Sequence, residues 1–144
     1  MGNNVVINLL DRYGWQYKET DDGNLVAGFQ GISGDFLLGF DIQENWLVIF
    51  TIKYLPKMKE GNKEELLFTL LKLNSKYPYT RFAMTSNKDI IILADVVIGD
   101  ENKVKYDAFQ LAMDMICEAV DSFYPTLYER ITGDKLAFPI EDKV

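Results

Sequence analysis

Hydrophobic residues along this chain repeat at two spacings, and the spacing changes at positions rich in Gly, Pro, Asn and Asp. Spacings of three and four residues are typical of helices with one buried face, whereas alternation is typical of strands. In chain order, the predicted elements are a helix over residues 5–13, strands over 25–29, 36–42 and 46–54, a helix over 64–76, strands over 81–85 and 90–98, and a helix over 104–133. The order α-β-β-β-α-β-β-α predicts an α+β fold with one five-stranded, mainly antiparallel sheet packed with helices.

The second and third predicted strands are apolar on both faces, which is unusual for a hairpin with one face in water. With a three-residue connection, Ile42 lies opposite Trp46, and one face of the hairpin is entirely apolar. The reverse face then carries Leu37, Leu47 and Ile49 among polar residues. Either a helix or the C-terminal tail covers this reverse face, or it is a surface for a second copy or a partner.

Length and composition are those of one domain with its own core. The chain has 144 residues, of which 48% are hydrophobic. A chain of this size buries enough surface to fold without a metal or a disulfide, and one cysteine allows no internal disulfide. Because a glycine ends the last predicted helix, we expect a single domain over residues 1–133 and a tail over 134–144.

The charge of the chain limits its partners. The formal net charge is −7, which repels phosphate backbones and anionic lipids. The N-terminus does not resemble a signal peptide, and no apolar run approaches the roughly 18 residues that a membrane helix requires. We therefore predict a cytoplasmic protein that binds neither nucleic acid nor membrane.

Residues with the chemistry of an active site are scarce. The chain has no histidine, which removes the usual general base near neutral pH and a common zinc ligand. Cys117 lies in the apolar seam of the last helix, where a thiol is usually a small buried hydrophobe. The glycines over residues 28–34 lie between strands and lack the Lys-Ser/Thr pair of a phosphate loop. We predict no catalytic residue and no cofactor.

Acidic residues are the remaining source of chemistry. The sequence near the end of the last strand contains Asp95, Asp100, Glu101 and Asp107. These four do not have the spacing of a calcium loop and are expected to be solvated, so we predict no metal site. A pair of carboxylates brought together by folding is the one enzymatic alternative, and the prediction is that the protein is not an enzyme.

Three parts of the sequence together resemble the YbjN family. They are Asn45–Phe50, then Leu70–Asn74 followed by Arg81–Met84, and finally Asp121–Leu127. Their marks are a helix that ends in Leu-Asn, an arginine that opens the next strand, and a last helix that runs into a proline. The resemblance extends over roughly Asn4–Gly133.

The resemblance implies a fold similar to that of type III secretion chaperones, with a one-layer sheet of five strands and three helices, and often a dimer. Members of the family are described as sensory transduction regulators or chaperone-like proteins. No active site accompanies these descriptions. Asn74 and Arg81 are therefore expected to be structural, as a helix cap and a strand-edge charge.

The leading functional prediction is a non-enzymatic interaction module, chaperone-like or regulatory, that binds a protein or peptide segment through an apolar sheet or groove surface. Leu37, Leu47 and Ile49 are the predicted contact residues, and a homodimer is a further possibility. The alternative is a small-ligand sensor with a pocket between the sheet and the helix over residues 106–123. A histidine-free enzyme is the third hypothesis.

Overall fold

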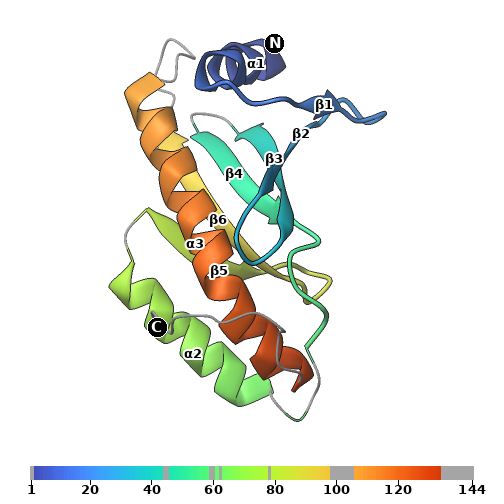
Figure 1. Cartoon of the computed structure of the whole chain (residues 1–144), viewed down its shortest axis with the longest axis vertical. Helices are drawn as coiled ribbons and strands as arrows, with labels where there is room; N and C mark the ends of the chain where they lie inside the picture. Colours follow the sequence, from blue (N-terminus) through green and yellow to red (C-terminus); the bar gives the residue numbers. More distant parts are fainter. Residues whose placement is uncertain are drawn as a thin grey trace.

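The computed structural model describes residues 2–43, 46–58, 61, 63–77, 79–97 and 106–133 (Figure 1). Its elements are α1 (Gly2–Tyr13), β1 (Lys18–Glu19), β2 (Leu25–Gln30), β3 (Asp35–Gln43), β4 (Trp46–Ile52), α2 (Lys63–Lys76), β5 (Thr80–Met84), β6 (Ile90–Val97) and α3 (Tyr106–Thr132). The predicted α+β class is confirmed. The predicted count of five strands is one too few, because β1 was missed. The tail over residues 134–144 lies outside the described residues, and the predicted domain boundary stays a prediction.

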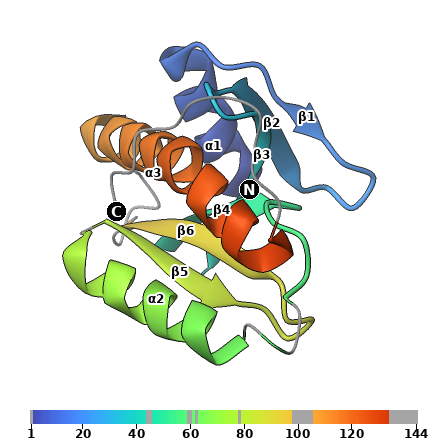
Figure 2. The same ribbon diagram turned by 60° about the horizontal axis from the view of Figure 1, so that its bottom comes forward.

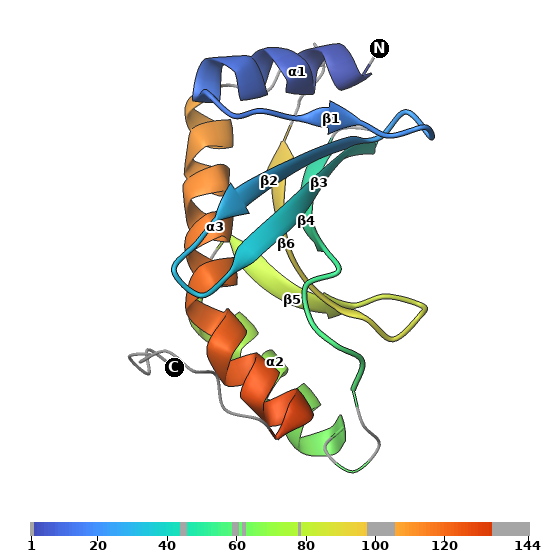
Figure 3. The ribbon, with the colours of Figure 1, turned by 45° about the vertical axis from the view of Figure 1, so that its right-hand side comes forward.

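The six strands form one antiparallel sheet in the order β1-β2-β3-β4-β6-β5. β6 lies between β4 and β5, as expected for a strand that is apolar on both faces. Helix α3 packs against β5 and β6, α2 against β5, and α1 against β3. Figure 1 and Figure 2 show α3 crossing one face of the sheet, and Figure 3 shows no described helix on the opposite face.

The pairing of β3 with β4 differs by one residue from the predicted register. Gln43 lies opposite Trp46, and Ile42 lies opposite Leu47. The reason is the length of the connection: β3 ends at Gln43 and β4 begins at Trp46, so two residues join them where three were expected. Two-residue connections are the commonest in hairpins, and a shift of one residue exchanges the faces of a strand.

Helix α3 forms the centre of the core. Its predicted seam is buried from Phe109 to Phe123 and continues to Leu127 and Ile131. Pro125 lies inside the helix and does not end it. Proline has no N–H to donate to the carbonyl four residues earlier, and that carbonyl, of Asp121, accepts a bond of 2.8 Å from the Ser33 hydroxyl instead.

The turn between β2 and β3 is attached to α3 by the carboxylate of Asp121. The backbone N–H groups of Ile32 and Ser33 donate to it at 2.9 and 2.7 Å, and the Ser33 hydroxyl, which shares its single proton with the Asp121 carbonyl, lies 2.6 Å from it. A Cβ at Gly31 would lie 2.5 Å from a carboxylate oxygen, so glycine is required there. The glycine-rich segment is therefore a turn between strands, as predicted, and Asp121 is the anion that it holds.

Candidate functional site

The face of the sheet opposite α3, here called the open face, carries apolar residues that reach solvent among the polar residues Asp41, Gln43, Arg81 and Asp95. Its outward-facing apolar residues are Val26, Leu37, Trp46, Val48, Phe50, Ile52, Ala83, Ile91, Leu93 and Val97. Trp46 and Val97 are opposite one another on β4 and β6 and are 47% and 61% exposed, while Leu37 on β3 is 43% exposed. No helix of the described ranges covers these residues (Figure 3), and contiguous exposed apolar surface of this kind is typical of interaction sites.

Of the three predicted contact residues, only Leu37 lies on the open face. Leu47 and Ile49 point to the opposite, helix-covered face, called the helix face, and neither has exposed surface. Their placement on the reverse face of the hairpin was wrong because the register was shifted. The residues missed were Trp46 and Val97; a two-residue connection in the hairpin would have identified Trp46, and Val97 lies beside it only through the pairing of β4 with β6.

One ion pair crosses the open face. Arg81 on β5 contacts Asp95 on β6, and the two side chains are half and one-quarter exposed. Asp95 is opposite Val48, so the pair lies among the apolar residues of the open face. Arg81 is thus a charge on an edge strand, as expected, and it has a partner. Exposed pairs of this kind contribute little stability.

The β5 edge of the sheet is closed by α2. Asn74 accepts a hydrogen bond from the Phe82 N–H at 2.7 Å and donates one to the Phe82 carbonyl at 3.2 Å. Its side-chain amide thereby imitates a neighbouring strand, which is how edges are protected from further pairing. Asn74 lies within α2, and its side chain closes a strand edge where a helix cap was expected. At the other edge, β1 pairs only with Leu25 and Val26 of β2.

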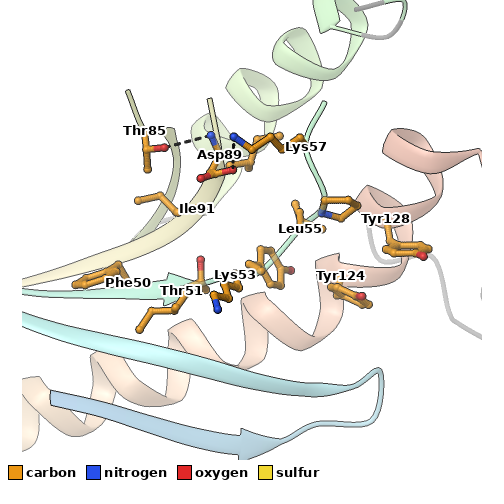
Figure 4. A pocket seen from close by; sticks show the side chains of 14 residues that line it. Phe50, Thr51, Lys53, Leu55, Lys57, Thr85, Asp89, Ile91, Tyr124 and Tyr128 are labelled. Carbon is orange, nitrogen blue, oxygen red and sulfur yellow. Dashed lines mark hydrogen bonds and ion pairs between the residues drawn. The ribbon is translucent and has the colours of Figure 1, made fainter. Parts of the chain in front are cut away.

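The open face leads into a pocket of about 640 Å³ at the end of the sheet, here called the end pocket (Figure 4). Its lining comes from β4, the connection to α2, the β5–β6 hairpin and the last turns of α3. The lining residues are Phe50, Thr51, Ile52, Lys53, Tyr54, Leu55, Pro56, Lys57, Thr85, Asp89, Ile90, Ile91, Tyr124 and Tyr128. Phe50, Ile52 and Ile91 belong to both the open face and the end pocket.

Aromatic rings make one wall of the end pocket. Tyr54 and Tyr124 have ring centroids 5.6 Å apart, and Tyr124 and Tyr128 are also 5.6 Å apart. The Tyr54 hydroxyl donates a bond of 2.6 Å to the Val120 carbonyl, and burial raises the pKa of Tyr54 well above its usual value. Tyr54 is therefore a neutral hydrogen-bond donor whose ring is held against α3.

Two lysines lie on the polar side of the end pocket and differ in their contacts. Lys57 is 3.1 Å from the Asn87 carbonyl and 3.9 Å from the Asp89 carboxylate. Lys53 is exposed, has no acidic partner within 4 Å in the described ranges, and has a φ of 51°. Such a φ is uncommon for a lysine, and uncommon backbone conformations are concentrated at functional sites.

The described residues offer little for catalysis. Among them, no group of three or more His, Cys, Asp or Glu side chains is placed to hold a metal ion. Cys117 is half-buried, and burial raises the pKa of its thiol to about 12, which keeps it protonated and unreactive at neutral pH. In the same ranges, no helix is both long and apolar enough to cross a membrane.

The fold and the open face define a small α+β protein with an apolar sheet surface that no described helix covers. A family model matches residues 4–129, and the chain belongs to that family, YbjN, described as "Putative bacterial sensory transduction regulator". The resemblance seen in the sequence is thereby confirmed. No curated protein sequence shows significant similarity to the chain.

Two solved structures share the fold. The crystal structure of Escherichia coli YbjN, a putative transcription regulator, superposes with a TM-score of 0.64 at 13% identity, covering 84% of this chain and 86% of that one. A chain of the heterodimeric ExoU–SpcU complex, from the type III secretion system of Pseudomonas aeruginosa, gives 0.58 at 16% identity, covering 88% and 98%. The predicted secretion-chaperone-like fold is therefore confirmed.

Proposed function

We propose that the protein is a non-enzymatic interaction module that binds an extended protein or peptide segment through the open face. The observation that carries this proposal is the exposure of Leu37, Trp46 and Val97 on one sheet face, over which the described part of the chain places no helix. Trp46 lies at one end of this surface, where β4 begins, and tryptophan is among the residue types that most often dominate binding energy. An apolar sheet surface gives affinity with limited sequence specificity, which suits a chaperone-like or regulatory role.

The comparisons support a protein partner. The secretion-system complex that shares the fold is a heterodimer of two different proteins, and the family is described in terms of regulation. Neither description includes a reaction. A protein segment is therefore the kind of ligand that we propose here, and the cytoplasmic location stays a prediction from the sequence.

The proposal is tested by selection of peptides on the immobilised full chain from a random display library. An enriched peptide is then synthesised, and its Kd is measured by fluorescence anisotropy. Leu37→Asp should weaken binding by about tenfold or more, because it places a charge on the apolar surface. Leu111→Asp is the matched control, since Leu111 lies on α3 and is 42% exposed against 43% for Leu37.

Two results would contradict the proposal. The first is that no peptide is enriched over an unrelated protein of the same charge. The second is that Leu37→Asp and Leu111→Asp change the Kd equally, which would show that the peptide binds elsewhere. Thermal unfolding of both variants checks that each is folded.

Self-association through a second surface is compatible with this function. Phe68 and Leu71 lie one helical turn apart on α2, and about two-thirds of each residue is exposed. We propose this pair as the contact for a homodimer. Light scattering should then give a dimer that Leu71→Asp converts to a monomer, and a wild-type monomer at high concentration would exclude the dimer.

A small-ligand sensor is the second candidate function, favoured by the volume of the end pocket. This pocket lies at the end of the sheet, beside Tyr124 and Tyr128, and differs in place from the predicted site beside residues 106–123. A thermal shift screen against metabolites distinguishes the candidates, because a ligand that binds only the native state raises the Tm. A rise with one chemical class, lost in Tyr128→Ala, would favour the sensor.

A further inference from the structure

The open face and the end pocket form one continuous surface. Phe50, Ile52 and Ile91 belong to both, so an apolar segment that lies on the open face can extend into the end pocket without leaving apolar contact. The seven residues of β4 rise about 3.3 Å each, which places Trp46 and Lys53 about 23 Å apart along the strand. The surface is long enough for an extended segment with two distinct ends.

The charge at the end pocket is opposite to that of the whole chain. Its lining contains two lysines, Lys53 and Lys57, and one carboxylate, Asp89, for a sum of +1. The chain as a whole has a net charge of −7. A negatively charged partner is therefore repelled by most of the surface and attracted here.

Lys53 is the lysine that remains available to a partner. Lys57 is engaged with the Asn87 carbonyl and the Asp89 carboxylate. Lys53 lies directly after β4 and also lines a neighbouring pocket of about 200 Å³ together with Asp35. No ion pair within 4 Å joins Lys53 to an acidic residue of the described ranges.

We infer that the end pocket binds a carboxylate of the partner segment, and that Lys53 pairs with it. This inference rests on the proposed function, because the open face must first hold the apolar part of the segment. The partner is then an extended apolar segment. One of its side chains covers Trp46, and its carboxylate lies about six to eight residues further along the segment. The carboxylate belongs to an acidic side chain or to a C-terminus.

The test uses the peptides enriched by display on the full chain. Each enriched peptide is synthesised in four forms, with its Asp or Glu kept or changed to the amide, and with a free or amidated C-terminus. If the inference holds, loss of the responsible carboxylate weakens binding about twofold to fivefold, the range of an exposed ion pair. The two modifications distinguish an acidic side chain from a C-terminus.

Variants of the protein then assign the carboxylate to Lys53. Lys53→Asn removes the charge and keeps a residue type that tolerates positive φ, so it should abolish the difference between acid and amide peptides, whereas Lys53→Arg should retain it. Lys88→Asn is the matched control, because Lys88 also has a positive φ, of 66°, and does not line the end pocket. Asp35→Asn should strengthen binding of the acid peptide.

The outcomes separate this inference from the proposed function. If enriched peptides depend on Leu37 but show no carboxylate effect, or show the same effect in Lys53→Asn as in wild type, the inference is overturned and the proposed function stands. If no peptide is enriched, or if binding is indifferent to Leu37→Asp, both are overturned. If the acid peptide binds more tightly than the amide peptide, and if Lys53→Asn removes this difference while Lys53→Arg and Lys88→Asn retain it, the result supports both the inference and the proposed function.

Discussion

The two faces of the sheet both carry large apolar side chains, but they differ in how far these side chains are exposed. On the helix face, Leu38, Leu47 and Ile49 have no exposed surface. On the open face, Trp46 and Val97 are about half exposed or more, although Trp46 lies on the same strand as Leu47 and Ile49, and Val97 lies on the adjacent strand β6. No described helix packs on the open face, so the same kind of side chain is core on one face and surface on the other.

This contrast shows what holds the fold together and what is available for binding. The side chains of the helix face pack against α3 and form the core. Exposing them to water would lower the stability of the fold. The open face contributes little to the core, and its apolar surface is available to a partner. Substitutions that separate these two roles therefore test the structure directly.

The largest expected effect comes from adjacent residues on opposite faces. Leu47→Asp buries a charge in the core and should unfold the protein, since such changes cost about 4 kcal/mol or more. Trp46→Asp is on the open face and should change stability by about 1 kcal/mol or less. Urea denaturation followed by circular dichroism measures both, and similar losses for the two variants would contradict the observed register.

A smaller effect is expected at the contact between the β2–β3 turn and α3. Asp121→Ala removes the charged acceptor of the Ile32 and Ser33 N–H groups, while the Ser33 hydroxyl keeps the Asp121 carbonyl as an acceptor. Loss of hydrogen bonds to a charged group should lower the free energy of unfolding by about 2–3 kcal/mol. Asp107→Ala, at an exposed position of the same helix, is the control in the same urea experiment. Equal stability of the two variants would show that the contact is unimportant.

A still smaller effect is expected at the β5 edge of the sheet, where Asn74 of α2 bonds to Phe82. Asn74→Ala leaves the Phe82 N–H and carbonyl without their side-chain partner, which should cost about 1–2 kcal/mol. Hydrogen exchange at Phe82 should increase, whereas Asn8→Ala on the exposed side of α1 should not affect it. Unchanged protection of Phe82 would mean that another group closes this edge.

The mildest effect is on pH dependence, and it concerns the helix face alone. Burial raises the pKa of Cys117 from 9.0 to about 12, and burial likewise raises the pKa of Tyr54 and Tyr13. The unfolded state loses these protons first, so the free energy of unfolding should be unaffected below pH 9 and should fall as the pH rises from 9 toward 12. Urea titrations at pH 7, 9 and 10.5 measure this, and Cys117→Ala should reduce the fall.

Much of the fold was predictable because the hydrophobic periods are long and regular. The seam of α3 and the alternation in β3 and β4 identified those elements, and the glycine turn after β2 was also expected. β1 was missed because Lys18–Glu19 is a two-residue strand of charged residues with no hydrophobic period. A hydrophobic pattern identifies an element that has one buried face. Both residues of β1 are exposed, so β1 has no such face.

The open face was only partly predictable. Both faces of the β3–β4 hairpin are apolar, so composition does not decide which face the helices cover, and one residue in the connection reverses the answer. Leu37 was identified and Trp46 was not. The end pocket and the free charge of Lys53 depend on how three distant segments meet, and no spacing in the sequence contains that information.

The most direct test of the central claim is the accessibility of Trp46 to acrylamide. The chain has two tryptophans, and Trp15 is half-buried with its ring centroid 5.5 Å from that of Phe29. In a Trp15→Phe variant shown to be monomeric by light scattering, Trp46 fluorescence should be quenched readily, and an enriched peptide should protect it. Weak quenching of Trp46 in the free monomer would show that the chain itself covers the open face and would contradict this account.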